Sequence, residues 1–254
     1  MIFDLLTAPE LLVCLAVAVV AGFIKGAVGF AMPLVLVAGM TLVIDPKLAI
    51  AGLILPTVAS NFVQVAKAGW HEAVEGTKYF WRFLLAACVM ILAVTQVVPL
   101  ISAQAVYLAV GFPVLILSII QLMGVHFHVD PAHKTRWDWV IGTLAGTIGG
   151  IAGNWGPPTV LYLIALETER KRQMAVQGVV YGAGSIMLLA GHLSSGLLTS
   201  QTMLFSATLL IPAWLGMQLG FRFGDRLDPK RFRQMTLLVL SVAALNLLRK
   251  GFFG

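Results

Sequence analysis

Two copies of one glycine-rich pattern carry most of the side chains that could do chemistry in this chain. The copies read Gly22-x-x-x-Gly26-x-x-Gly29-x-x-x-Pro33 and Gly146-x-x-x-Gly150-x-x-Gly153-x-x-x-Pro157, an offset of 124 residues. Lys25 and Phe30 lie in the first copy, and Asn154 and Trp155 lie in the second. A helix broken by such a turn exposes backbone N–H groups and the positive end of its dipole, both of which suit an anion. The pattern therefore predicts an anion-binding site.

The composition places this site inside a membrane. Of the 254 residues, 59% are hydrophobic and only 11% are charged, and the mean hydropathy is +0.93. A soluble domain has about 25% charged residues, and so few polar groups could not cover its surface. Disorder requires low hydrophobicity, and the apolar runs are continuous rather than alternating, which argues against a barrel. We therefore predict an all-α polytopic membrane protein.

The apolar runs supply the elements that must hold the site. They are Leu11–Ile24, Ala27–Ile44, Leu48–Ala66, Phe83–Ile101, Ala105–Met123, Trp139–Leu166, Met174–Ala190, Thr202–Gly220 and Met235–Leu248. Most are near the ~20 residues that a helix needs to cross a bilayer. Because glycines and prolines divide Trp139–Leu166, we count ten segments in two sets of five. The repeat units are expected near residues 8–123 and 132–250.

The distribution of positive charge predicts that each glycine-broken region is a hairpin. If each region crosses the membrane once, Lys and Arg are balanced between the two sides. If each returns to its starting side, 13 of the 17 Lys and Arg fall on one side, with Lys25 as a fourteenth if the turn reaches that side, and only Lys47, Arg249 and Lys250 fall on the other. The positive-inside rule favours the hairpins. The N-terminus is then outside, and the loops around Lys78, Lys134, Lys171 and Arg226 are cytoplasmic.

An odd number of segments in each unit makes the second unit enter from the opposite side. The sequence therefore predicts two inverted repeats, each a glycine-broken helical hairpin plus three transmembrane helices. The arms Trp139–Gly150 and Gly156–Leu166 would each span about 17–18 Å at 1.5 Å per residue, barely past the midplane. We expect two shallow hairpins whose turns approach each other from opposite faces.

Two interpretations remain open for the glycines and for Lys25. Small residues four apart also pack helices closely in membranes, so the glycines could serve packing instead of a ligand. Lys25 could be a counter-charge for the substrate, since ionisable residues inside a membrane are usually functional. Alternatively, it could extend to the cytoplasmic interface.

Further polar candidates lie in the paired segments that follow the two hairpins. Asn61 falls on Ser185 under the offset of 124 residues, and Tyr181 lies one helical turn before Ser185. These side chains could face one cavity, or they could join helices. The predicted substrate-binding residues are Lys25, Gly26, Gly29, Phe30, Asn61, Gly150, Gly153, Asn154, Trp155, Tyr181 and Ser185.

The sequence does not favour an enzyme. Ser185 and His192 are seven residues apart, about 10 Å along a helix, so they cannot form a nucleophile–base pair directly. We predict no cofactor and no metal site, and we interpret the loop His126–His133 as a solvated turn. The expected partners are a small anionic substrate and the lipid bilayer. Nucleic acid is not expected, because Lys and Arg sit in short loops that set orientation, and a homo-oligomer is left open.

The duplicated motif resembles the TauE/SafE group of membrane permeases, the sulfite exporter or TSUP family, over nearly the whole chain. Members carry two related halves, each opening with a glycine-rich motif that ends in proline. Many relatives have a glycine triplet before that proline, where this chain has Phe30-Ala31-Met32 and Asn154-Trp155-Gly156. The resemblance implies movement of small sulfur-containing anions such as sulfite, thiosulfate, or organosulfonates such as sulfoacetate.

The resulting hypothesis is a multi-pass protein of the cell (inner) membrane that exports such an anion. Alternating access would expose a midplane site between the two glycine-rich turns. An anion channel is one alternative, because the same turns could line a pore. A non-transport membrane subunit is a second alternative, from a different class of protein.

Overall fold

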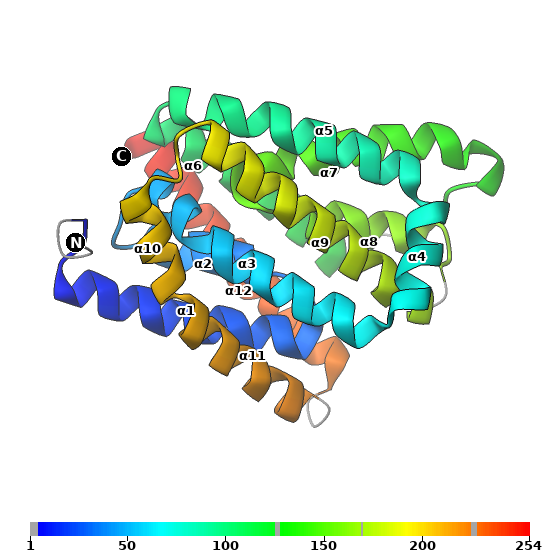
Figure 1. Cartoon of the computed structure of the whole chain (residues 1–254), viewed down its shortest axis with the longest axis horizontal. Coiled ribbons are helices and arrows are strands. Elements are labelled where there is room, and N and C mark those ends of the chain that lie inside the picture. The colour runs from blue at the N-terminus through cyan, green and yellow to red at the C-terminus, as the bar shows by residue number, and fades with distance from the viewer. Residues whose placement is uncertain (1–4, 125–127, 169, 225–227) are drawn as a thin grey trace.

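The computed structural model describes residues 5–124, 128–168, 170–224 and 228–254, and all regular elements within these residues are helical. The helices are α1 (Ala8–Val28), α2 (Met32–Met40), α3 (Pro46–Ala68), α4 (Trp70–Tyr79), α5 (Trp81–Val97), α6 (Ala103–Leu122), α7 (Lys134–Ala152), α8 (Gly156–Ala165), α9 (Arg170–Ser194), α10 (Ser200–Thr208), α11 (Leu210–Gly224) and α12 (Pro229–Phe253), with short 3-10 turns at Val98–Leu100 and Pro131–His133. Most of these helices run along the long axis of the molecule (Figure 1).

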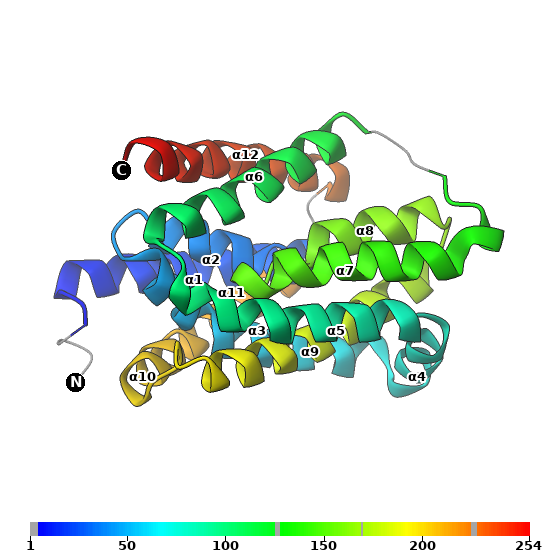
Figure 2. The ribbon, with the colours of Figure 1, turned by 90° about the horizontal axis from the view of Figure 1, so that it is seen from above.

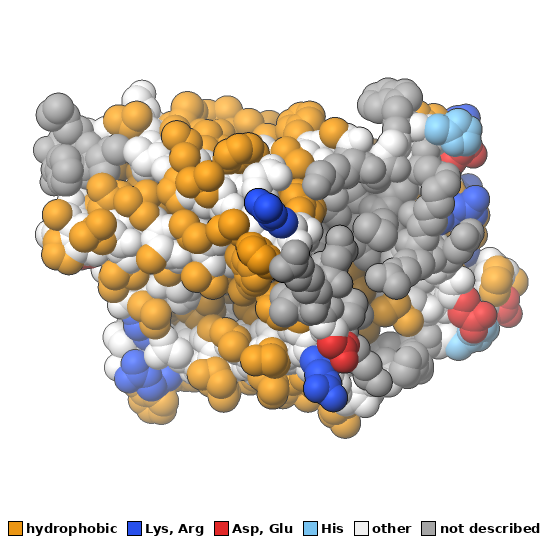
Figure 3. Space-filling model, turned by 90° about the horizontal axis from the view of Figure 1, so that it is seen from below, with side chains coloured by type: hydrophobic (Ala, Val, Ile, Leu, Met, Phe, Trp, Pro, Cys, Tyr) orange, Lys and Arg blue, Asp and Glu red, His pale blue; other side chains and the backbone are white. Residues whose placement is uncertain are grey.

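The described residues include seven helices that are long and apolar enough to cross a membrane. Their outer faces carry large hydrophobic side chains in the open, among them Ile116, Leu215 and Val242. On the face shown in Figure 3, hydrophobic side chains cover the left and the middle of the described surface, and most acidic and histidine side chains lie toward the right-hand end. Lipid, rather than water, suits such a belt. The predicted all-α polytopic membrane fold is confirmed.

Each glycine-rich motif folds as a helix, a tight turn and a returning helix. Helix α1 ends at Gly29, whose φ of +83° is left-handed, and α2 begins with Pro33 in its first turn. Helix α7 ends in the same way at Gly153, with φ +69°, and α8 begins with Pro157 in its first turn. Glycine adopts this φ without steric cost, and proline fits a first helical turn. The third glycine and the proline of the motif therefore define the turn.

The other two glycines of each motif lie within the entering helix and serve helix packing. A Cβ atom on Gly22 would lie 2.0 Å from the carbonyl oxygen of Ala213, and one on Gly26 would lie 2.3 Å from that of Met217. In the second copy, a Cβ atom on Gly146 would lie 2.4 Å from the carbonyl oxygen of Ala87. These glycines let α1 approach α11, and α7 approach α5, to backbone contact.

The two hairpins enter from opposite ends of the molecule, and their turns meet near its middle (Figure 2). Their packing partners are matched, because α1 packs on α11 as α7 packs on α5, while α3 packs on α9 and α6 packs on α12. A two-fold relation between two inverted halves produces this pairing. We therefore retain 8–123 and 132–250 as the proposed repeat units, which the matched pairing supports.

The hairpins differ from the expected shallow ones, because their entering arms are long. Helix α1 has 21 residues and continues through Lys25 to Val28, and α7 has 19 residues and begins at Lys134. The returning helices α2 and α8 have only 9 and 10 residues. The first arm does not stop at Ile24 because Gly26 stays helical and Gly29 provides the left-handed C-cap.

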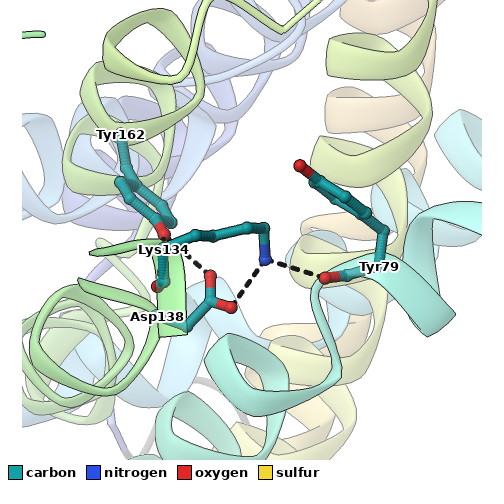
Figure 4. A network of polar contacts seen from close by, with 4 residues as sticks. All are labelled: Tyr79, Lys134, Asp138 and Tyr162. Carbon is teal, nitrogen blue, oxygen red and sulfur yellow. Dashed lines mark hydrogen bonds and ion pairs between the residues drawn. The ribbon is translucent and has the colours of Figure 1, made fainter. Parts of the chain in front are cut away.

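Helix α7 begins five residues before its apolar run because a buried polar cluster stabilises its first turn (Figure 4). The Nζ atom of Lys134 donates to Oδ2 of Asp138 at 2.6 Å and to the carbonyl oxygen of Tyr79 at 2.8 Å. Tyr162 of α8 donates its hydroxyl to Oδ1 of Asp138 at 2.8 Å. The Asp138 side chain is only 1% exposed. The cluster joins α7, α8 and the junction between α4 and α5.

Two other segments add detail to the sequence expectation. The predicted span Thr202–Gly220 corresponds to one candidate membrane span, Ser200–Phe223, which is interrupted at Leu209 between α10 and α11. Proline cannot donate a helical hydrogen bond, and Pro212 lies in the first turn of α11, which accounts for the break. The polar stretch from Lys67 to Arg82 contains the helix α4, which packs on α9.

Lysines of the loops lie at the two ends of the molecule in the way that the hairpin arrangement predicts. The start of α1 and the end of α12 lie at the same end of the molecule (Figure 1). Near that end, Lys47 donates to the carbonyl of Pro99, and Lys250 donates to the carbonyl of Thr41. The cluster at Lys134 lies at the opposite end, beside α4. Arg226 and residues 125–127 of the predicted solvated loop lie outside the described residues. An outside N-terminus remains a prediction.

Candidate functional site

A small cavity lies where the two turns meet. A Cβ atom on Gly153 would lie 3.3 Å from Cβ of Pro33, and one on Gly156 would lie 3.8 Å from Cβ of Phe30. The space open to water is about 20 Å³, enough for about one molecule. The cavity is lined by Lys25, Phe30, Ala31, Pro33, Leu34, Asn61, Gly153, Asn154, Trp155, Gly156, Pro157 and Tyr181.

Lys25 brings a positive charge into this cavity. The residue is 3% exposed, so its side chain does not extend to the membrane surface. Its Nζ atom donates to Oδ1 of Asn61 at 2.6 Å and lies 5.1 Å from the centre of the Tyr181 ring. Among the described lining residues no Asp or Glu is present, and no described carboxylate is paired with the ammonium. A buried ion without a counter-charge is costly, which indicates a site for an anion.

Asn61 fixes the place of Lys25 and connects the two halves. Its Oδ1 accepts from Lys25 of α1, and its Nδ2 donates to the carbonyl oxygen of Tyr181 on α9 at 2.8 Å. The Tyr181 hydroxyl donates in turn to the carbonyl oxygen of Gly156, at the start of α8, at 3.4 Å. One chain of hydrogen bonds therefore joins α1, α3, α9 and α8 around the cavity.

Asn154 supplies polar atoms that have no partner within the described structure. The residue is 3% exposed, and neither Nδ2 nor Oδ1 of its side chain makes a hydrogen bond. Buried polar groups are nearly always paired, and an unpaired one costs about 1–3 kcal/mol. Because Asn154 lines the same cavity as Lys25, its amide group is available to a ligand there.

Trp155 closes one wall of the cavity. A Cβ atom on Gly149 would lie 2.6 Å from Cε3 of the indole, and one on Gly184 would lie 3.2 Å from Cε2. These two glycines on α7 and α9 leave the room that the ring occupies, and the ring is 2% exposed. Sequence reasoning placed Trp155 at the site, but it did not identify the glycines that accommodate it.

The returning helices α2 and α8 both begin at the cavity, so the positive ends of their dipoles are directed toward it. They offer fewer backbone donors than the sequence argument assumed. Pro33 occupies the first turn of α2, and Pro157 and Pro158 occupy the first turn of α8. Proline has no N–H group. Side-chain donors therefore have to contribute more of the binding than the glycine turns suggested.

The structure separates the predicted site residues into two groups. Seven line the cavity, namely Lys25, Phe30, Asn61, Gly153, Asn154, Trp155 and Tyr181. The other four are not among its lining residues. Gly26 and Gly150 lie at helix contacts, and Gly29 provides the left-handed turn. The Ser185 hydroxyl donates to the carbonyl of Gly182 one turn earlier in the same helix, α9, so it neither lines the cavity nor joins two helices.

Five lining residues were not among the predicted site residues, namely Ala31, Pro33, Leu34, Gly156 and Pro157. Ala31 has a φ of +74°, one of two non-glycine residues with a positive φ among the described residues. Such a backbone is strained for alanine, and strain of this kind often marks a functional site. Its position between Gly29 and Pro33 was the only available signal, because the residue type itself carries none.

The geometry gives no support to an enzyme at the Ser185–His192 pair. Ser185 is engaged with the carbonyl of Gly182. The two ring nitrogens of His192 have no hydrogen-bond partner within the described structure. A nucleophile needs a base within hydrogen-bond reach, so these two residues do not form a catalytic pair. The central cavity, in contrast, combines a buried lysine with an unpaired amide, groups that suit a small anion.

Comparison with known protein families matches residues 14–247 to the family described as sulfite exporter TauE/SafE. Comparisons with curated proteins and with solved structures gave no match. The family match covers both glycine-rich motifs and the helices that surround the cavity, and it confirms the resemblance drawn from the motifs. The chain therefore belongs to the sulfite exporter TauE/SafE family.

Proposed function

We propose that this protein exports a small sulfur-containing anion, an organosulfonate such as sulfoacetate or the inorganic ions sulfite and thiosulfate. Membership of the family makes it a membrane transporter of sulfur anions at the level of the family. The observation that carries the finer proposal is the presence of Lys25 and Asn154 in one cavity. A buried ammonium without a described carboxylate partner and an unpaired amide line one cavity between the two turns.

The cavity supports alternating access because the space inside it is very small. A volume of about 20 Å³ admits about one water molecule, and a sulfur oxyanion is larger than water. The turns Gly29–Ala31 and Gly153–Trp155 therefore have to separate for the substrate to enter. Because the hairpins enter from opposite ends (Figure 2), rocking of one unit against the other would open the cavity to each side in turn.

The residues around the cavity have distinct proposed roles. The ammonium of Lys25 would neutralise the oxyanion, and the amide of Asn154 would donate to it. Trp155 and Phe30 would limit the space and contact any short carbon chain of the substrate. Asn61 would hold Lys25 in place, since it already accepts from Nζ. Ser185 has no role in this proposal.

Export is the direction that the membrane potential favours. With the inside negative, moving one negative charge outward releases about 2.3 kcal/mol per 100 mV. No carboxylate lines the cavity among the described residues, so no acidic proton carrier is placed beside the substrate. The proposal is therefore uniport of the anion, with Lys25 and His192 as the remaining groups that could carry a proton.

Flux in proteoliposomes tests the proposal. Purified protein is reconstituted, and efflux of labelled sulfite, thiosulfate or sulfoacetate is followed with and without the same anion on the far side. A carrier predicts saturation and acceleration by the anion on the far side, and a channel predicts no such acceleration. A non-transport subunit predicts no flux above that of empty vesicles.

Variants connect that flux to the cavity. Lys25→Gln and Asn154→Ala should each reduce flux, and Lys78→Gln is the matched control because Lys78 is exposed and paired with Glu75. If all three variants had the flux of the unmodified protein, the cavity would have no part in transport. A flux that depends on ΔpH at clamped zero voltage would contradict uniport.

A further inference from the structure

The cavity contains a single charged side chain and is otherwise lined by neutral groups. Among the described lining residues, Lys25 is the only Lys, Arg, Asp or Glu. Its ammonium is held at 2.6 Å from Oδ1 of Asn61 and lies over the Tyr181 ring. The remaining lining consists of the amide of Asn154, aromatic rings, prolines, glycines and aliphatic side chains. This lining offers at most one positive charge to a ligand.

A ligand with one negative charge forms a neutral pair with Lys25 inside the cavity. A second negative charge would have no partner there. An unpaired buried ion carries a desolvation penalty that a neutral amide does not offset. The dipoles of α2 and α8 add only partial charge, and prolines replace N–H donors in their first turns.

The small size of the cavity strengthens the preference for a ligand with one negative charge. Only about 20 Å³ is open to water in the cavity, so a second charge could not keep a hydration shell when the turns close. Asn61 cannot supply a compensating charge, because it is neutral and already holds Nζ of Lys25 and the carbonyl of Tyr181. The charge of the substrate is therefore set by one side chain.

We infer that the transported species carries a single negative charge, as a monoanionic organosulfonate or hydrogen sulfite does, and that dianions are discriminated against at the cavity. This inference rests on the proposed function and specifies the charge of the substrate. Within the group of anions proposed above, it narrows the preferred substrates to hydrogen sulfite and sulfonates with a neutral carbon chain, ahead of the dianions sulfoacetate, thiosulfate and fully ionised sulfite.

The test compares two ligands of nearly the same shape that differ by one charge. Sulfoacetamide carries one negative charge, and sulfoacetate at neutral pH carries two. Equilibrium binding of each to the purified full-length protein in detergent is measured by calorimetry at constant ionic strength. We expect sulfoacetamide to bind at least about tenfold more tightly than sulfoacetate. A pH series with sulfite should show tighter binding where hydrogen sulfite prevails.

A variant identifies the origin of the preference. Lys25→Gln should abolish sulfoacetamide binding, whereas Lys78→Gln should leave both affinities unchanged. Because the ligand comparison uses the unmodified protein, it does not depend on whether the Lys25 variant folds. Equal binding of the two ligands, or tighter binding of sulfoacetate, would overturn the inference while leaving anion transport intact. Absence of binding and of flux for every sulfur anion would instead overturn the proposed function.

Discussion

The Nζ atom of Lys25 lies 2.6 Å from Oδ1 of Asn61, and this neutral acceptor is the only described hydrogen-bond partner of the buried ammonium. An aspartate at that position would complete an ion pair and leave no charge for a ligand. Asparagine instead positions the cation and leaves its charge uncompensated. The empty site is therefore less stable than one in which Lys25 is paired with a carboxylate. A bound anion supplies the missing negative charge.

Replacing Asn61 by aspartate should convert the anion site into an internal ion pair. We expect Asn61→Asp to weaken anion binding by about tenfold or more and to change the melting temperature little, because the new ion pair is offset by loss of the hydrogen bond from Nδ2 to the carbonyl oxygen of Tyr181. Differential scanning fluorimetry and calorimetry in detergent measure the two effects. Unchanged anion affinity in a folded Asn61→Asp protein would show that Lys25 does not bind the ligand.

Replacing Lys25 by methionine should separate stability from function. Methionine has a similar length and removes a buried charge that has no described counter-ion, and the desolvation penalty relieved in this way offsets the lost hydrogen bond to Asn61. We expect the melting temperature of Lys25→Met to be equal to or above that of the unmodified protein, with anion flux lost. A large fall in melting temperature would indicate that Lys25 is needed for folding instead.

Removing the amide of Asn154 should weaken anion binding without lowering the melting temperature. Because Nδ2 and Oδ1 have no described partner, Asn154→Ala removes no internal hydrogen bond. We expect a melting temperature that is unchanged or slightly higher, and an anion affinity reduced by about 1–3 kcal/mol, the value of a hydrogen bond to a charged group. Titration with the anion that gives flux measures the change. Unchanged affinity would exclude Asn154 from the contact.

The motif glycines should be sensitive to a single methyl group where they pack helices. A Cβ atom on Gly26 would lie 2.3 Å from the carbonyl oxygen of Met217, whereas the nearest atom to a Cβ on Gly178 is 3.5 Å away. Gly26→Ala should lower stability by about 1–3 kcal/mol or more, while Gly178→Ala in α9 should be neutral or stabilising. Thermal unfolding of the two variants side by side checks this. Equal melting temperatures would contradict the close contact between α1 and α11.

The cluster around Asp138 should stabilise the second hairpin (Figure 4). The side chains of Lys134 and Asp138 are 13% and 1% exposed and lie 2.6 Å apart. Removing one partner of a buried pair costs about 3–5 kcal/mol, whereas replacing both by apolar groups is often neutral. We expect Asp138→Leu to be strongly destabilising and Lys134→Met to restore stability in the double variant. A double variant no more stable than Asp138→Leu alone would argue against the pair.

The sequence by itself determined the class of fold and the place of the breaks. Long apolar runs exclude a soluble protein because too few polar groups remain to cover a surface. The repeated pattern located both turns, since a left-handed glycine and a following proline act through local backbone geometry. The count of loop cations also favoured hairpins over single crossings, and the directions of α1 and α7 agree with it (Figure 2).

Only the tertiary structure decided which residues of the motif face the cavity. Gly26 and Gly29 lie three residues apart, yet one packs against α11 and the other forms the turn. Lys25 is directed to Asn61 rather than to the membrane surface. Asn61 and Ser185 occupy equivalent positions in the repeat, yet they have different hydrogen-bond partners. Sequence spacing fixes where a side chain leaves its own helix. Its neighbours depend on contacts between segments more than a hundred residues apart.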